Sequence, residues 1–196
     1  SGVRRRASDR AMTDLLRTTE VRWFLAGPLP PAADAWFARL GPRIEGETRT
    51  DHYLAPTDDA LGLKLREGAL EPKRRDAVGG PLTAGRAHAA VETWTKWSFP
   101  LAADAGPEAG WVEVTKTRRQ REIVTGAGRC RLDVSEVTVG GAVWWSVCLE
   151  AEGPNDDAAR SALGAGAARW LARTDAPALP AEAAMGYPAW LRSQVG

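Results

Sequence analysis

Basic residues of one short stretch lie at the spacing of a β-hairpin. Residues 61–66 (LGLKLR) and 69–75 (ALEPKRR) alternate charged with uncharged residues, and Glu67-Gly68 between them is a turn-forming pair. Side chains of a strand alternate between its two faces, so the hairpin presents one basic face. Such a face is either solvated, as is usual for cations, or it binds an anion. The residues on it are Lys64, Arg66, Lys73 and Arg75.

The same alternation recurs elsewhere with both signs of charge. In residues 20–25 (EVRWFL) the acidic and basic side chains oppose Val21, Trp23 and Leu25. Further polar faces occur in residues 111–121, 129–138 and 143–152. Their charged members, with those of the first segment, are Glu20, Arg22, Lys116, Arg118, Arg131, Asp133, Glu150 and Glu152.

These segments predict a protein of the α+β class. We expect strands at 20–25, 47–54, 61–66, 69–75, 91–99, 111–121, 129–138 and 143–152, and a loop at 78–90. We expect helices after Pro30-Pro31, from Asn155 to about residue 173, and over 181–193, the last interrupted by Tyr187-Pro188. Eight mostly antiparallel strands can form a closed or nearly closed barrel, which removes their exposed edges.

Composition limits the possible functions. The chain has 196 residues, which suits one domain over 18–196, preceded by a flexible basic arm over 1–17. The 26 basic residues are balanced by 25 acidic ones, which argues against a general nucleic-acid binder. No apolar run is long enough to span a bilayer, so we expect a cytoplasmic protein. The sequence does not indicate an oligomeric state.

If amphipathic helices cover the outside of the barrel, the apolar strand faces must point outward and the charged faces inward. The result is a tunnel lined by both signs of charge, which is costly unless the charges are paired, hydrated or bound to a ligand. A polyanion held by cations, with a divalent metal held by carboxylates, satisfies both signs together.

The charged segments also resemble a known family. They are Glu20, residues 49–54 (RTDHYL), the LKLREG…LEPKRR hairpin, and residues 116–119 (KTRR), 132–134 (LDV) and 149–153 (LEAEG). Their order and spacing over residues 20–153 resemble the CYTH superfamily, also called triphosphate tunnel metalloenzymes. The resemblance implies an antiparallel barrel and hydrolysis of a small, phosphorylated anionic ligand, such as a triphosphate, with Mg²⁺ or Mn²⁺.

The resemblance also implies roles for individual residues. It implies that Glu20, Glu150 and Glu152 are catalytic residues, and that Glu150, Glu152 and Asp133 bind the metal ion. It assigns the anion to Lys64, Arg66, Lys73, Arg75, Lys116 and Arg118. Arg22, which replaces a carboxylate of the family, is a further candidate for the anion because a planar guanidinium suits phosphate, and Arg131 on the polar face of its strand is another. The family typically opens with Glu-x-Glu-x-Lys, whereas this chain has Glu20, Arg22 and Phe24. Two alternatives therefore stay open: a binding module without catalysis, and a different reaction on an organic substrate in the same tunnel.

Aromatic and sulfur side chains complete the predictions. Trp94 and Trp144 share the polar faces of their strands, so they either stack on a ligand or fill the end of the barrel. Cys130 and Cys148 fall on opposite faces of neighbouring strands, which predicts two free thiols. We expect Cys148 to be reached by a small reagent through the tunnel.

Overall fold

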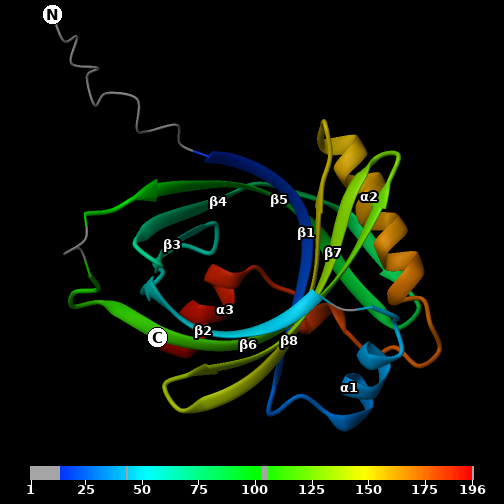
Figure 1. The fold of residues 1–196 in the computed structure, drawn as a ribbon, viewed down its shortest axis with the longest axis horizontal. Coiled ribbons are helices and arrows are strands. Elements are labelled where there is room, and N and C mark those ends of the chain that lie inside the picture. Colours follow the sequence, from blue (N-terminus) through cyan, green and yellow to red (C-terminus); the bar gives the residue numbers. More distant parts are fainter. Residues whose placement is uncertain (1–13, 43, 103–105, 196) are drawn as a thin grey trace, which may run out of the picture.

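Eight β-strands form a closed antiparallel barrel, as the charge alternation predicts. The structure, a computed structural model, describes residues 14–42, 44–102 and 106–195 (Figure 1). Around the barrel the strands follow the order β1-β5-β4-β3-β2-β6-β7-β8. The strands are β1 (Asp14–Ala26), β2 (Ile44–Leu54), β3 (Leu61–Arg66), β4 (Ala69–Ala84), β5 (Ala87–Pro100), β6 (Trp111–Thr125), β7 (Gly128–Val139) and β8 (Ala142–Glu152).

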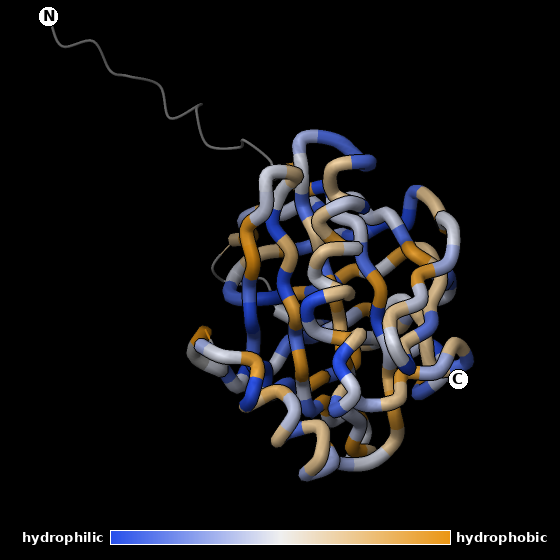
Figure 2. Tube along the Cα trace, turned by 90° about the vertical axis from the view of Figure 1, so that its right-hand side faces the viewer, coloured by the Kyte–Doolittle hydropathy of each residue, from blue (hydrophilic) through white to orange (hydrophobic). Residues whose placement is uncertain are grey.

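The hairpins form where the turn residues predict them. Glu67 and Gly68 both have positive φ, 47° and 76°, which is the geometry of a two-residue turn that matches strand twist. Gly140 and Gly141 join β7 to β8 in the same way, with φ of 55° and 81°. Along the strands hydrophilic and hydrophobic residues alternate (Figure 2), so each strand has one polar and one apolar face.

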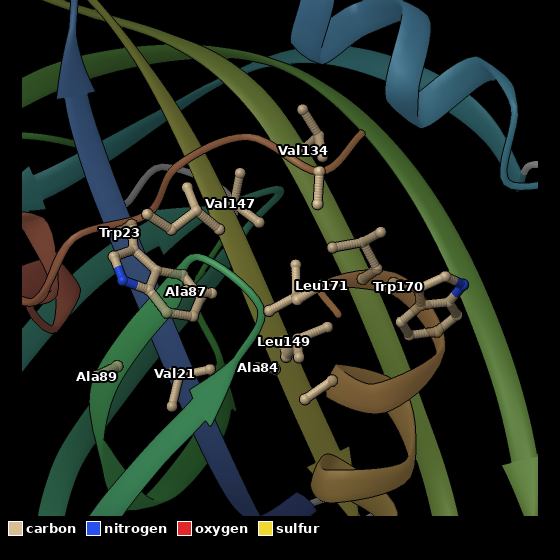
Figure 3. Close-up of a cluster of buried hydrophobic side chains, with 14 of the residues drawn as sticks. Val21, Trp23, Ala84, Ala87, Ala89, Val134, Val147, Leu149, Trp170 and Leu171 are labelled. Atoms are coloured by element: carbon tan, nitrogen blue, oxygen red, sulfur yellow. The ribbon is translucent and has the colours of Figure 1, made fainter. Parts of the chain in front are cut away.

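The apolar strand faces point outward and pack under helices. Helix α2 (Asp156–Trp170) begins at Asn155, whose side chain accepts a hydrogen bond from Ala158 N at 2.9 Å. Helix α1 (Pro31–Ala38) contributes Trp36 and Phe37 to the same core. Figure 3 shows part of this core, in which Trp170 of α2 lies near side chains of the barrel wall such as Val134 and Leu149. The charged faces are thereby left inside the barrel.

Two segments differ from the sequence-based expectation. Residues 78–90 are not a loop, because β4 continues to Ala84 and β5 begins at Ala87. Register shifts between Arg75 and Ala77, and between Val78 and Pro81, accommodate the glycines and proline that indicated a loop. Strand β1 begins at Asp14, so the end of the expected arm is part of the sheet; the rest of the arm, residues 1–13, lies outside the described residues.

The last part of the chain lies inside the barrel. The expected helix over 181–193 is divided into a 3₁₀ turn, η1 (Ala181–Ala183), and α3 (Tyr187–Val195). In Figure 1 α3 lies within the ring of strands, whereas α1 and α2 lie outside it. We call residues 184–191 the C-terminal plug. Among the described residues, none of the helices combines the length and apolar character needed to cross a membrane.

Candidate functional site: a charged cavity inside the barrel

A cavity of about 370 Å³ lies in the charged part of the barrel interior. Its volume is within the range of small-molecule sites in proteins. Predicted site residues that line it are Arg22, Lys64, Arg66, Lys73, Lys116, Arg118, Arg131, Asp133 and Glu150. Alternation along the strands is what brings these distant residues to one space.

Other lining residues were not among the predicted ones. Arg49 and Lys96 follow the same alternation on β2 and β5, so the sequence contained a signal for both. Tyr53 also follows it. Tyr187 belongs to the C-terminal plug, and no strand pattern could have placed it in the cavity.

One group of charges joins β1, β4, β5 and β8. Glu20 and Glu150 are directly opposite each other in the β1–β8 register. Lys73 Nζ lies 2.5 Å from Glu20 Oε1, and Lys96 contacts Glu150 and lies 4.0 Å from Glu20 Oε2. Burial opposes ionisation of Glu150, but Lys96 and Lys73 outweigh it and hold the pKa of that carboxyl far below its usual range. Glu150 is therefore charged, and Glu20 lies directly opposite it.

A second group surrounds Asp51, whose side chain is fully buried. Arg66 donates two hydrogen bonds to it, of 3.0 and 3.2 Å, and Lys116 Nζ lies 3.8 Å away. Burial would raise the pKa of Asp51, but the Arg66 hydrogen bonds and the charge of Lys116 lower it to about 2. Lys64 is 2.6 Å from Glu71, and its pKa falls to about 8 because it is buried and lies beside Arg66.

Burial opposes the charge of Arg22, but Glu20, Asp133 and Glu150 are close enough for their charges to raise its pKa. Over the part of the chain that the structure describes, none of the ion pairs within 4.0 Å includes it, and its Nε is buried without a hydrogen bond. Its guanidinium is 5.8 Å from the ring centre of Tyr187 and 5.9 Å from that of Phe24. In the register Arg22 faces Cys148, which in turn faces Asp133. Arg22 thus lines the cavity, although its Nε atom is buried.

The remaining predicted residues, Glu20, Arg75 and Glu152, do not line the cavity. Arg75 is 2.7 Å from Glu92 and stacks on Trp94, which is fully buried. Glu152 contacts Arg129 at 2.7 Å and Arg131 at 3.6 Å, away from the cavity lining.

Trp94 and Trp144 fill the barrel interior, which is the second of the two roles that their sequence positions allow. Trp94 lies beneath Lys73, whose Nζ is 4.4 Å from its ring centre. Trp144 packs at 6.1 Å against Trp190 of the C-terminal plug. Neither side chain lines the cavity, so both fill the barrel rather than face a ligand there.

The expected metal ligands have separate partners. Glu150 contacts Lys96, Glu152 contacts arginines, and Asp133 accepts hydrogen bonds from Ser135 and Gln120. Among the described residues, no group of three or more His, Cys, Asp or Glu is arranged to hold a metal ion. A smaller set does fit one: Glu20 Oε2 is buried without a hydrogen bond beside the position of Glu150. Mg²⁺ is commonly bound by one or two carboxylates together with substrate phosphates.

Comparisons with known proteins do not assign the chain to a family. No family model matches it, and no curated protein matches it. A solved structure of the RNA triphosphatase Pct1 of S. pombe, in complex with the Spt5 CTD, matches with a TM-score of 0.39 and 13% identity over 80% of this chain and 81% of that one. Any function must therefore be argued from the residues of the cavity themselves.

Proposed function

We propose that the cavity binds a small polyphosphate-containing ligand and, with a divalent cation, hydrolyses its phosphoanhydride bond. The observation that carries this proposal is Arg22, which among the described residues has no ion pair within 4.0 Å and lies in a cavity lined by further cations. A guanidinium offers a planar fork of donors that suits phosphate oxygens. A ligand with several phosphates would contact Arg22 together with Lys64 and Lys116, which line the same cavity.

The carboxylate pair supports the hydrolytic part of the proposal. Glu20 and Glu150 would hold Mg²⁺ or Mn²⁺ together with phosphate oxygens of the ligand. Such an ion supplies a Lewis acid that polarises the phosphorus centre and orients water. Lys73 and Lys96 keep the two carboxylates in place. The cations around the phosphates would neutralise charge that develops on the leaving group.

A binding module without catalysis is the second candidate. It is favoured by the contacts of the carboxylates, because Glu20 and Glu150 are each already paired with a lysine. It is also favoured by Arg22, which places a positive charge near the positions of Glu20, Glu150 and Asp133.

Binding is tested by calorimetry with linear tripolyphosphate in the absence of metal. Arg22→Gln should weaken affinity by about ten- to a hundredfold, because a hydrogen bond to a charged group contributes about 1.5–3 kcal/mol. Arg74→Gln is the matched control, since Arg74 is exposed on the outside of the same barrel and pairs with Asp76. Equal affinities of the wild type and a folded Arg22→Gln protein would overturn the proposed role of the cavity.

Hydrolysis is tested by phosphate release from tripolyphosphate with Mg²⁺ or Mn²⁺. Glu150→Gln keeps the shape of the side chain but removes the charge that a hard cation needs. We expect this variant to lose phosphate release while it still binds tripolyphosphate without metal. A wild-type protein that binds tripolyphosphate, yet releases no phosphate with either ion, is a binding module instead.

A further inference from the structure

Lysine and arginine are distributed differently over this protein. The 26 basic residues comprise four lysines and 22 arginines. Most of the described arginines lie away from the cavity, whereas every lysine of the chain lines it. Both side chains serve as cations for a phosphate, but only a lysine has an amine that can become neutral and act as a nucleophile. The lysines are Lys64, Lys73, Lys96 and Lys116.

Three of these four amines are paired with a carboxylate. A carboxylate at hydrogen-bonding distance favours the charged ammonium form of lysine. An ammonium nitrogen has no lone pair with which to attack a carbonyl carbon, so these pairs make the three amines poor nucleophiles. The pairs are Lys64 with Glu71 at 2.6 Å, Lys73 with Glu20 at 2.5 Å, and Lys96 with Glu150.

Lys116 has a different partner. Its Nζ atom donates a hydrogen bond of 2.8 Å to the hydroxyl of Tyr53, and the nearest oxygen of Asp51 is 3.8 Å away. That carboxylate already accepts two hydrogen bonds from Arg66. Lys116 therefore lines the cavity with a neutral hydroxyl, rather than a carboxylate, at hydrogen-bonding distance from its amine.

The surroundings of Lys116 also disfavour its charged form. Burial has the largest effect on its pKa, and cations on three other strands act in the same direction. Asp51 and the face of the Tyr187 ring, whose centre is 4.1 Å from Nζ, act in the opposite direction. Burial and the cations outweigh them, so the pKa of Lys116 lies well below its usual range. The cations are Lys64 of β3, Arg22 of β1 and Arg49 of β2.

We infer that a phosphorylated aldehyde binds covalently in the cavity, as an imine on Lys116. The cations beside Lys116 would bind the phosphate, and the cavity of about 370 Å³ suits a small molecule. The lone pair of the neutral amine attacks the carbonyl carbon, and the carbon–oxygen double bond breaks as a carbon–nitrogen double bond forms. Both hydrogens of the amine leave with the carbonyl oxygen as water, so the step needs no oxidant or reductant. The inference goes beyond the proposed function and shares with it only the binding of phosphate by the cavity cations.

The test is reductive trapping with pyridoxal phosphate as the probe. The full chain is incubated with the probe, borohydride reduces the imine to a stable amine, and peptide mass spectrometry locates the adduct. We expect one adduct, on Lys116, which saturating tripolyphosphate suppresses. Pyridoxal, which lacks the phosphate, should label Lys116 about ten- to a hundredfold less at the same concentration, because it makes no charge-assisted hydrogen bonds to the cavity.

Two variants separate the amine from its charge. Lys116→Arg keeps the positive charge but has no amine, so it should form no adduct. Lys96→Arg is the matched control, because Lys96 lines the same cavity but is paired with Glu150, and it should keep the adduct on Lys116. If Lys116→Arg does not fold, the position of the adduct in the wild type decides the question.

The outcomes distinguish this inference from the proposed function. An adduct on another lysine or on the amino terminus in place of Lys116, or equal labelling by pyridoxal, would overturn the inference. A protein that binds tripolyphosphate by calorimetry, yet forms no adduct, would also overturn it and leave the proposed function standing. An adduct on Lys116 in a protein that does not bind tripolyphosphate would support the imine site and count against the proposed function.

Discussion

Glu20 is a fully buried carboxyl group with two lysines beside it. Lys73 contacts it at 2.5 Å, and Lys96 is at 4.0 Å from its other oxygen. Removing one partner of a buried pair leaves an uncompensated charge, which is more costly than removing both. We therefore expect the stability of the protein to depend on keeping Glu20 paired with Lys73.

Lys73→Met should lower the free energy of unfolding by about 3 kcal/mol, since a buried ion pair that loses one member costs about 3–5 kcal/mol and Lys96 remains nearby. The double variant Lys73→Met with Glu20→Gln should recover part of that loss. Urea denaturation of both proteins measures the difference. If the Lys73→Met protein is as stable as the wild type, the contact with Lys73 does not stabilise the buried Glu20.

Lys64 should make ligand affinity depend on pH. Burial and Arg66 lower its pKa to about 8 in the free protein, and a bound polyanion favours the protonated form and raises that pKa. Binding above pH 8 therefore takes up a proton, and affinity falls as pH rises through 8. Calorimetry in buffers of different ionisation enthalpy measures the uptake. Lys64→Met is the control, because the titration of the ligand itself affects both proteins equally. If affinity changes with pH to the same extent in the wild type and in Lys64→Met, Lys64 does not have this role.

At the scale of elements, α2 packs against the barrel through a glycine. A Cβ on Gly166 would lie 2.5 Å from Cys130 Sγ, whereas a Cβ on Gly164 of the same helix meets nothing within 4 Å. The two glycines of α2 therefore have different surroundings. Only Gly166 is required for close approach to β7.

Gly164→Ala should raise the free energy of unfolding by about 0.5–1 kcal/mol, because alanine is the better helix former. Gly166→Ala gains the same propensity but overpacks the contact with Cys130, and should lower stability by about 1–3 kcal/mol. Thermal denaturation of the two variants provides the comparison. If both are stabilised, α2 can shift away from β7 without cost.

The hairpin over residues 61–75 and the inward charges were predictable, because both depend on local alternation. The strands over residues 78–90 were not, since their glycines and proline are tolerated only through register shifts against β5. The position of α3 was also not predictable. It depends on Phe24, Tyr53 and Trp94 from three separate strands, and no local pattern in residues 184–191 encodes them.

At the scale of the whole molecule, both thiols report on global opening. Cys130 and Cys148 are free, as predicted, and both are fully buried. The expectation that a reagent reaches Cys148 from the tunnel is wrong, because Cys148 is fully buried and not part of the cavity lining. Burial also raises the pKa of each thiol, which reduces its reactivity.

We expect Cys130 and Cys148 to react with a thiol reagent at one common rate set by unfolding. Mass spectrometry after labelling at increasing urea concentrations measures this, and tripolyphosphate should slow both sites equally by stabilising the native state. Labelling of Cys148 alone in native buffer would indicate local access from the cavity.

The order of strands around the barrel has a consequence for how fast the protein reaches its native state. β1 pairs with both β5 and β8, so Glu20 meets Glu150 only when segments far apart in the chain come together. Such non-local pairing must overcome loop-closure entropy before it gains any contact, which makes barrels slow to fold. Until that closure the strand edges are unpaired and prone to intermolecular pairing. We therefore expect the carboxylate pair and Arg22 to come together in one late kinetic step, so that the proposed binding site forms only with the complete barrel.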